Sequence, residues 1–166
     1  TNLIMGIVVI FLLVFSTAGF ALLSGGGSGG DNYGNTDDAY YNGAYWVYQQ
    51  EGQEFYLVNS VEETIDVPVD ITLNLGDYVG VNTYLVSDNE VINSEIGQNL
   101  ARYTGRLQRA CYGPCEEDLP EKGCTENLII YQDAEENRVY QEQNCVFIEG
   151  SLLAVDAFLY KILGFS

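Results

Sequence analysis

The longest run of apolar positions lies near the beginning of the chain. Residues 3–23 read LIMGIVVIFLLVFSTAGFALL and contain no charged side chain. As an α-helix this run would be about 31 Å long, close to the roughly 30 Å hydrocarbon thickness of a bilayer. A helix that is apolar on every face needs lipid or similar helices around it, the alternative being a buried core helix. We therefore expect residues 1–24 to form a hydrophobic assembly or transmembrane helix.

A glycine-rich segment separates this run from the rest of the chain. Residues 25–30 read GGGSGG, which offers almost no side chains for packing. Such a segment behaves as a flexible tether. Residues 31–166 then constitute a separate head domain.

The first half of the head has the pattern of strands. Residues 45–50 and 54–59 are aromatic and β-branched and predict a hairpin that turns near Gly52. Residues 67–75 alternate apolar and polar positions, which predicts a half-buried strand. Residues 77–87 predict a further strand, with Gly80 marking a bulge.

The second half of the head mixes helical and strand patterns. Residues 94–110 have helical periodicity, with one apolar face, and residues 151–163 predict a closing helix that packs on the sheet. Gly164, just past that helix, is a good C-terminal signal. Between the helices, residues 127–132 and 138–148 predict two antiparallel strands around a turn at residues 136–137.

The predicted fold class is therefore α+β. We expect an N-terminal hydrophobic helix, a Gly-rich linker, and a disulfide-tied, mostly antiparallel β-sheet head with two helices.

The cysteines predict the disulfides of this head. Cys111, Cys115, Cys124 and Cys145 are even in number and all follow the apolar run. In an oxidising exterior, such cysteines form disulfides. A Cys111–Cys115 bond would close a very tight loop, so crossed pairs that tie the helix end to the later strands are favoured. A four-cysteine zinc site is the alternative, but the spacing is irregular and no C-x₂-C motif is present.

The net charge and the amino-acid composition of the chain exclude several classes of function. Six Lys and Arg oppose 24 Asp and Glu, for a net charge of −18, and the chain has no His. An acidic surface repels phosphates, so no nucleic-acid partner is expected. The lack of His excludes Ser-His-Asp and Cys-His catalysis and His-ligated metals. Because no nucleotide-binding or catalytic motif is present, we expect neither enzymatic activity nor a cofactor.

Three arginines form a candidate contact surface of the head. Arg102, Arg106 and Arg109 share one stripe of the helix predicted over residues 94–110. The acidic surface of a neighbouring molecule could dock on this stripe and fix its orientation. Pairing with carboxylates of the same head is the alternative.

Aromatic residues form a second candidate surface. Tyr40, Tyr41 and Trp46 belong to a stretch, residues 31–48, that combines tyrosines with aspartates. Exposed Tyr and Trp side chains suit contacts with a neighbouring subunit, and they also suit stacking on sugars. Alternatively, these aromatics face the core of the head.

The N-terminal segment resembles that of a processed type IV pilin-like subunit, of the kind that builds archaeal and bacterial surface filaments. The apolar run is preceded only by Thr1 and Asn2, and the first basic residue is Arg102. Prepilin-type peptidases cut before such a run and leave it on the protein. Met5 stands where bacterial pilins usually have Glu, so the archaeal type is closer. A single-pass anchor with unusual flanking residues is the alternative.

A second likeness concerns the end of the chain. Residues 124–131 (CTENLIIY), 144–150 (NCVFIEG) and 156–164 (DAFLYKILG) look like the ends of uncharacterised surface proteins from small archaea. This likeness implies no particular activity.

The pilin resemblance implies an extracellular structural subunit that is membrane-inserted before assembly and whose partners are copies of itself. Its helix would assemble through apolar side chains, which are Leu3, Ile7, Val9, Ile10, Leu12, Leu13, Phe15 and Phe20. The competing hypothesis is a single-pass, membrane-anchored surface ectodomain. Such a protein would act as an adhesion or binding module for a surface glycan or a neighbouring cell.

Overall fold

A computed structural model describes residues 39–165 of the chain. The expected hydrophobic helix of residues 1–24, with its assembly residues, and the linker of residues 25–30 lie outside the described residues. Within the described part, no helix combines the length and the hydrophobicity that a membrane crossing requires.

The described chain begins with a small antiparallel sheet. Strands β1 (Tyr40–Tyr41), β2 (Trp46–Gln50) and β3 (Gln53–Leu57) are hydrogen-bonded in that order and are called the meander below. The predicted hairpin is confirmed, because β2 and β3 are joined by Glu51 and Gly52, both with positive φ. Two such residues form the tight turn whose twist matches that of a hairpin. The short helix α2 (Val61–Thr64) follows and is capped by Ser60.

The main sheet is six-stranded and mixed. Its strands are β4 (Val69–Asp70), β5 (Asn82–Val86), β6 (Arg106–Arg109), β9 (Asn127–Gln132), β10 (Arg138–Glu142) and β11 (Cys145–Glu149), in the order β4-β10-β11-β9-β5-β6. Strands β10 and β11 are antiparallel, and the other neighbours in this sheet are parallel. The α+β class is thus confirmed, and the expected antiparallel pairing is found in the meander and between β10 and β11.

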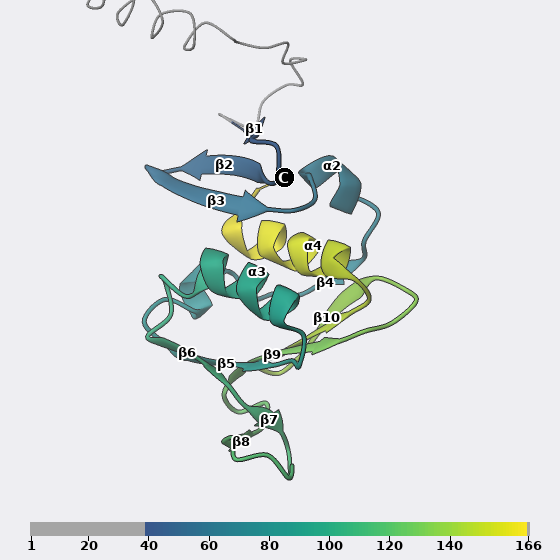
Figure 1. Ribbon diagram of the computed structural model, residues 1–166. Helices are drawn as coiled ribbons and strands as arrows, with labels where there is room; N and C mark the ends of the chain where they lie inside the picture. Colours follow the sequence, from purple (N-terminus) through teal and green to yellow (C-terminus); the bar gives the residue numbers. More distant parts are fainter. Residues whose placement is uncertain (1–38, 166) are drawn as a thin grey trace, which may run out of the picture. The chain divides into compact units, whose positions relative to one another are not determined.

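The helices lie between the two sheets. Figure 1 shows α3 (Glu90–Leu100) and α4 (Leu152–Leu163) with the meander on one side and the six-stranded sheet on the other. A short parallel pair, β7 (Cys111–Tyr112) and β8 (Glu121–Lys122), extends beyond the far side of the sheet. The 3₁₀ helix η1 (Leu75–Asp77) precedes β5.

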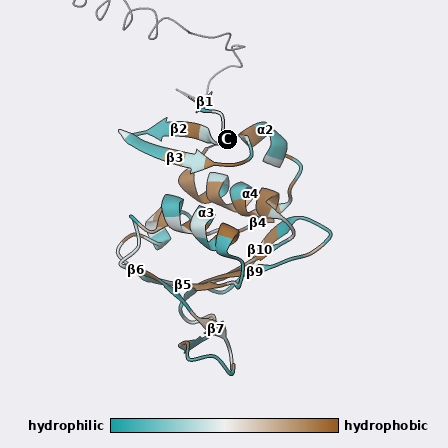
Figure 2. Ribbon diagram, in the orientation of Figure 1, coloured by the Kyte–Doolittle hydropathy of each residue, from teal (hydrophilic) through white to brown (hydrophobic). Residues whose placement is uncertain are grey.

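Helix α4 is buried almost all round. Every residue from Ala154 to Tyr160 is buried, as are Ile162 and Leu163. Hydrophobic residues dominate α4 and recur along the strands beneath it (Figure 2). As predicted, α4 packs on the sheet and ends at Gly164, which has the left-handed conformation of a helix cap. The meander covers the side of α4 opposite the sheet, and this explains the lack of a polar face.

Two strand predictions need correction. Of residues 67–75, only Val69 and Asp70 pair in a strand, because Asn74 turns the chain into η1. The Asn74 side chain accepts a hydrogen bond from Gly76 N, and Asn74 N donates to the Asp77 carboxylate. Residues 138–148 form two strands, β10 and β11, which turn at Gln143 with positive φ. Strand β9 therefore pairs with β11 in parallel, rather than with β10 around residues 136–137.

The helix predicted over residues 94–110 is also corrected. Helix α3 begins after its cap Asn89 and ends at Leu100, whereas residues 106–109 form the edge strand β6 beside β5. Pairing with β5 requires a close approach at Gly105, where a Cβ atom would lie 2.6 Å from the Gly80 carbonyl oxygen. Gly80 belongs to a turn with positive φ, not to a strand bulge. Helix α2 is a third helix that the sequence pattern did not indicate.

We predict that Gly150→Ala destabilises the head by about 2–3 kcal/mol. Gly150 has φ +116°, and an added Cβ would lie 2.3 Å from Asn137 Oδ1. That oxygen also accepts hydrogen bonds from Ser151 N and Oγ at the start of α4. Urea unfolding of the full chain in detergent micelles measures the effect.

The matched control is Gly97→Ala in α3, where an added Cβ meets no atom within 4 Å. Alanine is favoured over glycine in a helix, so this variant should be more stable by up to about 1 kcal/mol. If Gly150→Ala proved as stable as the unmodified chain, the described junction between β11 and α4 would be wrong.

Candidate functional site

All four cysteines form disulfides, as the sequence predicts, but not in crossed pairs. Cys111 is bonded to Cys115 and Cys124 to Cys145, with sequence separations of 4 and 21. The tight loop from Cys111 to Cys115 is possible because Gly113 has φ +73°. Parallel pairing of β9 with β11 brings Cys124, just before β9, to Cys145 at the start of β11.

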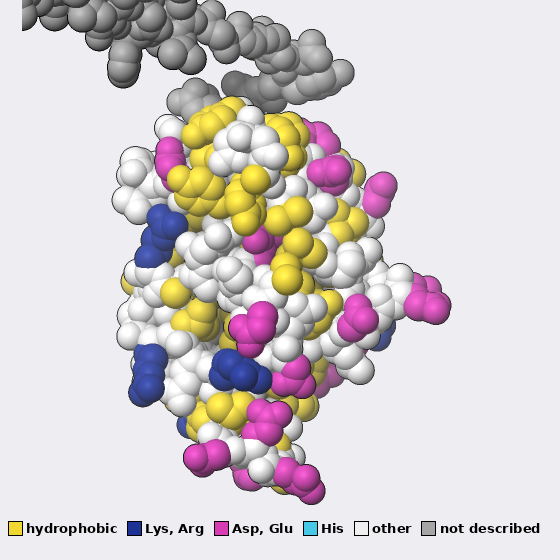
Figure 3. Space-filling model, viewed as in Figure 1, with side chains coloured by type: hydrophobic (Ala, Val, Ile, Leu, Met, Phe, Trp, Pro, Cys, Tyr) yellow, Lys and Arg dark blue, Asp and Glu magenta, His cyan; other side chains and the backbone are white. Residues whose placement is uncertain are grey.

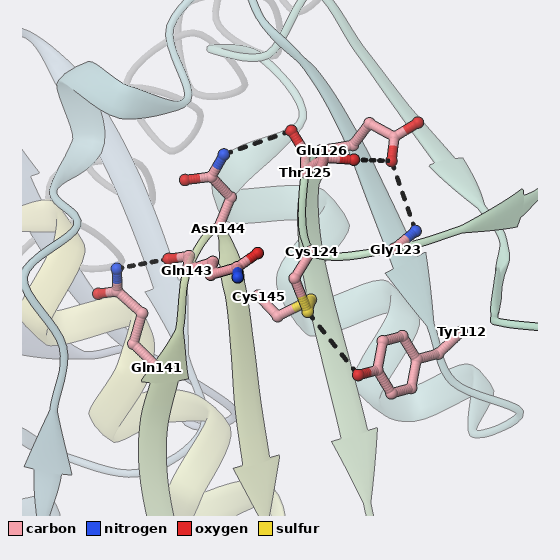
Figure 4. Close-up of a disulfide and its surroundings, with 9 residues drawn as sticks. All are labelled: Tyr112, Gly123, Cys124, Thr125, Glu126, Gln141, Gln143, Asn144 and Cys145. Atoms are coloured by element: carbon pink, nitrogen blue, oxygen red, sulfur yellow. Dashed lines mark hydrogen bonds between the residues drawn. A yellow bond between two sulfur atoms is a disulfide. The ribbon is translucent and has the colours of Figure 1, made fainter.

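Polar contacts surround the Cys124–Cys145 disulfide (Figure 4). Asn144 Nδ2 donates to the Thr125 carbonyl oxygen at 3.4 Å, and the Tyr112 hydroxyl donates to Cys124 Sγ at 3.8 Å. Cys145 is completely buried. This disulfide therefore joins the beginnings of two central strands, whereas Cys111–Cys115 closes a loop outside the sheet.

We predict unequal effects of removing the two disulfides. Through loop-closure entropy, the Cys124–Cys145 bond should contribute about 3 kcal/mol to the free energy of unfolding, and the shorter Cys111–Cys115 loop about 2 kcal/mol. Replacing both members of each pair by serine should therefore lower the urea midpoint more for the first pair. Equal midpoints for the two double variants would show that the long loop carries no extra stabilisation.

The three arginines do not share a helical stripe. Arg102 follows α3, whereas Arg106 and Arg109 lie in β6. Arg109 pairs with Asp88 at 3.1 Å, within the same head. Arg102 donates to the Gln53 side chain and the Gln98 carbonyl oxygen, both at 3.1 Å. Arg106 is exposed and makes no ion pair with another described residue. The basic groups at β6 therefore remain partly available to a neighbour.

The predicted aromatic surface divides into exposed and packed parts. Tyr40 and Tyr41 are 49% and 54% exposed on β1. Trp46 instead packs partly against the main core, with its ring 5.5 Å from that of Tyr41. The tyrosines form the exposed part of this surface, and Trp46 lies between Tyr41 and the core.

A second aromatic group, which the sequence analysis missed, lies on the sheet face away from the helices. Tyr140 and Phe147 stack with ring centroids 5.0 Å apart, and Tyr112 meets Phe147 edge-on at 5.8 Å. They border a second apolar cluster that includes Leu128 and Ile130. Consecutive apolar residues in 128–130 and 145–148 are the signal that could have revealed it, because a strand apolar at successive positions is covered on both faces.

One open depression, of about 680 Å³, lies where β5 and β9 end. The carboxyl ends of parallel strands are a common place for ligands. Its charged lining residues are Asp88, Glu90 and Asp133, all acidic. Within residues 39–165, no group of Asp, Glu and Cys side chains is arranged to hold a metal ion. The lining residues that the structure describes therefore include no basic side chain to bind an anion and no ligand set for a cation.

A buried polar cluster connects the meander to the helices. Glu95 of α3 and Asp156 of α4 are 4% and 0% exposed. Burial and the neighbouring Asp156 charge raise the pKa of Glu95 to about 8. Burial also raises the pKa of Asp156, to about 6, although hydrogen bonds from Asn59 oppose that shift. Both side chains are closed to solvent, and this indicates a role within the fold.

Comparison with known proteins adds no further evidence, since no protein-family model, curated protein or solved structure matches the chain.

Proposed function

We propose that the protein is the structural subunit of an extracellular, pilus-like filament that polymerises through residues 3–23. The observation that supports this most is the combination of a long, uncharged apolar segment with a head that contains two disulfides. Disulfides persist in oxidising compartments, so they favour a head outside the cell. The apolar segment is then the part of the chain available for insertion or assembly.

Burial of the apolar segment provides the driving force for polymerisation. Removing apolar surface from water yields about 25 cal/mol per Å². Residues 3–23 contain no side chain that must remain hydrated. A bundle of such helices would bury them as completely as lipid does, so the same segment anchors the subunit before assembly and forms the filament core afterwards.

The linker and the head surface are consistent with this role. The GGGSGG segment allows the helices to pack in one arrangement while the heads adopt another. Acidic side chains are spread over the visible face of the head, where basic side chains are few (Figure 3). A surface of this kind stays hydrated and soluble. In the proposed filament, exposed Tyr40 and Tyr41 contact neighbouring heads, and Arg106 contacts the acidic surface of a neighbour.

We predict that Val9→Asp or Leu12→Asp abolishes filaments while the head stays folded. A charge at the centre of a dry bundle is strongly unfavourable. The control, Ser28→Asp, places the same charge in the linker and should leave the filaments intact. Electron microscopy of sheared cell-surface material, with antibody against the head, measures assembly. Normal filaments from Val9→Asp would contradict the proposal.

The second candidate function is a membrane-anchored binding module. It is favoured by a depression of about 380 Å³ in the meander, lined by Glu54, Tyr56 and Arg102 among others. Carboxylate, phenol and guanidinium groups together suit the hydroxyl groups of a saccharide. Shearing of the cell surface also distinguishes the two proposals. A filament subunit should appear in the sheared fraction, whereas a single membrane-anchored ectodomain should be recovered only with detergent.

A further inference from the structure

The end of the meander is hydrogen-bonded to two buried carboxyl groups. The backbone N–H of Val58 donates to Glu95 Oε1 at 3.1 Å. The backbone N–H and the side-chain amide of Asn59 both donate to Asp156 Oδ2 at 2.8 Å. The segment that leaves β3 is therefore held by one carboxyl group from each helix.

Side chains also occupy the free edge of β3. The Asn99 side-chain amide accepts from Tyr56 N at 2.9 Å and donates to the Tyr56 carbonyl oxygen at 2.7 Å, as a neighbouring strand would. The Tyr160 hydroxyl donates to the Asn59 carbonyl oxygen at 2.7 Å. The meander thus depends on polar side chains of α3 and α4 as well as on apolar contacts.

No basic side chain in the described part of the chain forms an ion pair with either of the two carboxyl groups. The titratable groups near Asp156 on β2 and α4 are Tyr48 and Tyr160, and the side chain near both tyrosines on α2 is Glu62, which is acidic and not basic. The neutral Gln98 amide donates to Glu95 Oε2 at 3.0 Å. Two adjacent buried carboxylates without a cation would be strongly destabilising.

Asp156 Oδ1 indicates where a proton would bind in this cluster. Asp156 Oδ1 is buried and receives no hydrogen bond from any N–H or O–H group that the structure describes. The adjacent Glu95 carboxyl can supply the donor only in its protonated form. A single proton on Glu95 would remove one of the two negative charges and also satisfy Asp156 Oδ1.

We propose that Glu95 and Asp156 form a proton-binding site, and that their shared proton holds the meander on α3 and α4. Loss of the proton leaves two buried carboxylates side by side. The segment of residues 56–61 then moves away from the helices and admits water to both groups. The site makes the attachment of the meander sensitive to pH.

The direction of this sensitivity follows from the raised pKa of Glu95. With the meander open, hydrated carboxyl groups lose their protons near pH 4.5, whereas in the closed state Glu95 keeps its proton until about pH 8. Because the pKa of Asp156 in the closed state is about 6, the closed state binds one more proton than the open state, on Glu95, between about pH 6 and 8. The stabilisation of the closed state is complete below pH 4.5 and is lost as pH rises to about 8. Between about pH 6 and 8, where one proton is released, the opening equilibrium increases about tenfold per pH unit.

Hydrogen exchange of the full chain in detergent micelles tests the proposal. After correction for the intrinsic effect of pH on exchange, protection of the amides in residues 53–59 should fall about tenfold per pH unit between about pH 6 and 8. Protection in β9 should not follow it, because only the meander opens. In Glu95→Gln, the neutral amide donates permanently to Asp156, and protection of residues 53–59 should be independent of pH between about pH 6 and 8.

The matched control is Glu90→Gln, an exposed position in the same helix, which should behave as the unmodified chain does. Constant protection of residues 53–59 in the unmodified chain, or the same pH dependence in Glu95→Gln, would overturn the proposal. A fall of β9 protection in step with β3 would also overturn it, since the whole head would then be opening.

A second measurement requires no variant. The infrared carbonyl band of a protonated carboxyl group should be present in the unmodified chain at pH 7 and should disappear with a midpoint near 8. If all carboxyl groups are ionised at pH 7, the proposed site does not exist.

Discussion

Helix α4 is apolar on two opposite sides, and both sides must be covered. The arrangement of the rest of the head depends on this constraint. Residues two positions apart on a helix point in nearly opposite directions. Phe158 packs against Tyr78, whereas Tyr160 packs against Tyr48 of the meander. A helix this apolar would expose much of its surface if it were covered by the six-stranded sheet alone. The meander is therefore required as a second cover, and the three layers of the head follow from this single helix.

The same burial explains where the polar groups of the head interior lie. Asp156 is completely buried in α4, beside Glu95, because both reach the backbone of the segment that leaves β3. No strand among the described residues pairs with that segment, so side chains satisfy its N–H and C=O groups. The hydrogen bonds of Glu95 and Asp156 thus fix the position of the meander on the helices, and a single proton removes one of the two negative charges of these carboxyl groups.

The sequence predicts those features that depend on neighbouring residues. The β2–β3 hairpin and the closing helix with Gly164 have local signals, and both are found in the structure. The disulfide pairing and the strand β6 depend on contacts between distant residues. The Cys124–Cys145 bond requires the parallel β9–β11 pair, and β6 replaces a predicted helix because β5 offers a pairing edge. The buried pair of Glu95 and Asp156 was not predicted either, since acidic residues in helices usually indicate a solvated face.

Coverage of α4 on both sides is measured by a nuclear Overhauser experiment on the full chain in detergent micelles, with selectively labelled aromatic residues. The ring centroids of Tyr48 and Tyr160 lie 5.1 Å apart, and those of Tyr78 and Phe158 lie 6.5 Å apart. We expect cross-peaks for both pairs in the same sample. A cross-peak between Tyr78 and Phe158 without one between Tyr48 and Tyr160 would show that the meander does not cover α4, and would contradict this account.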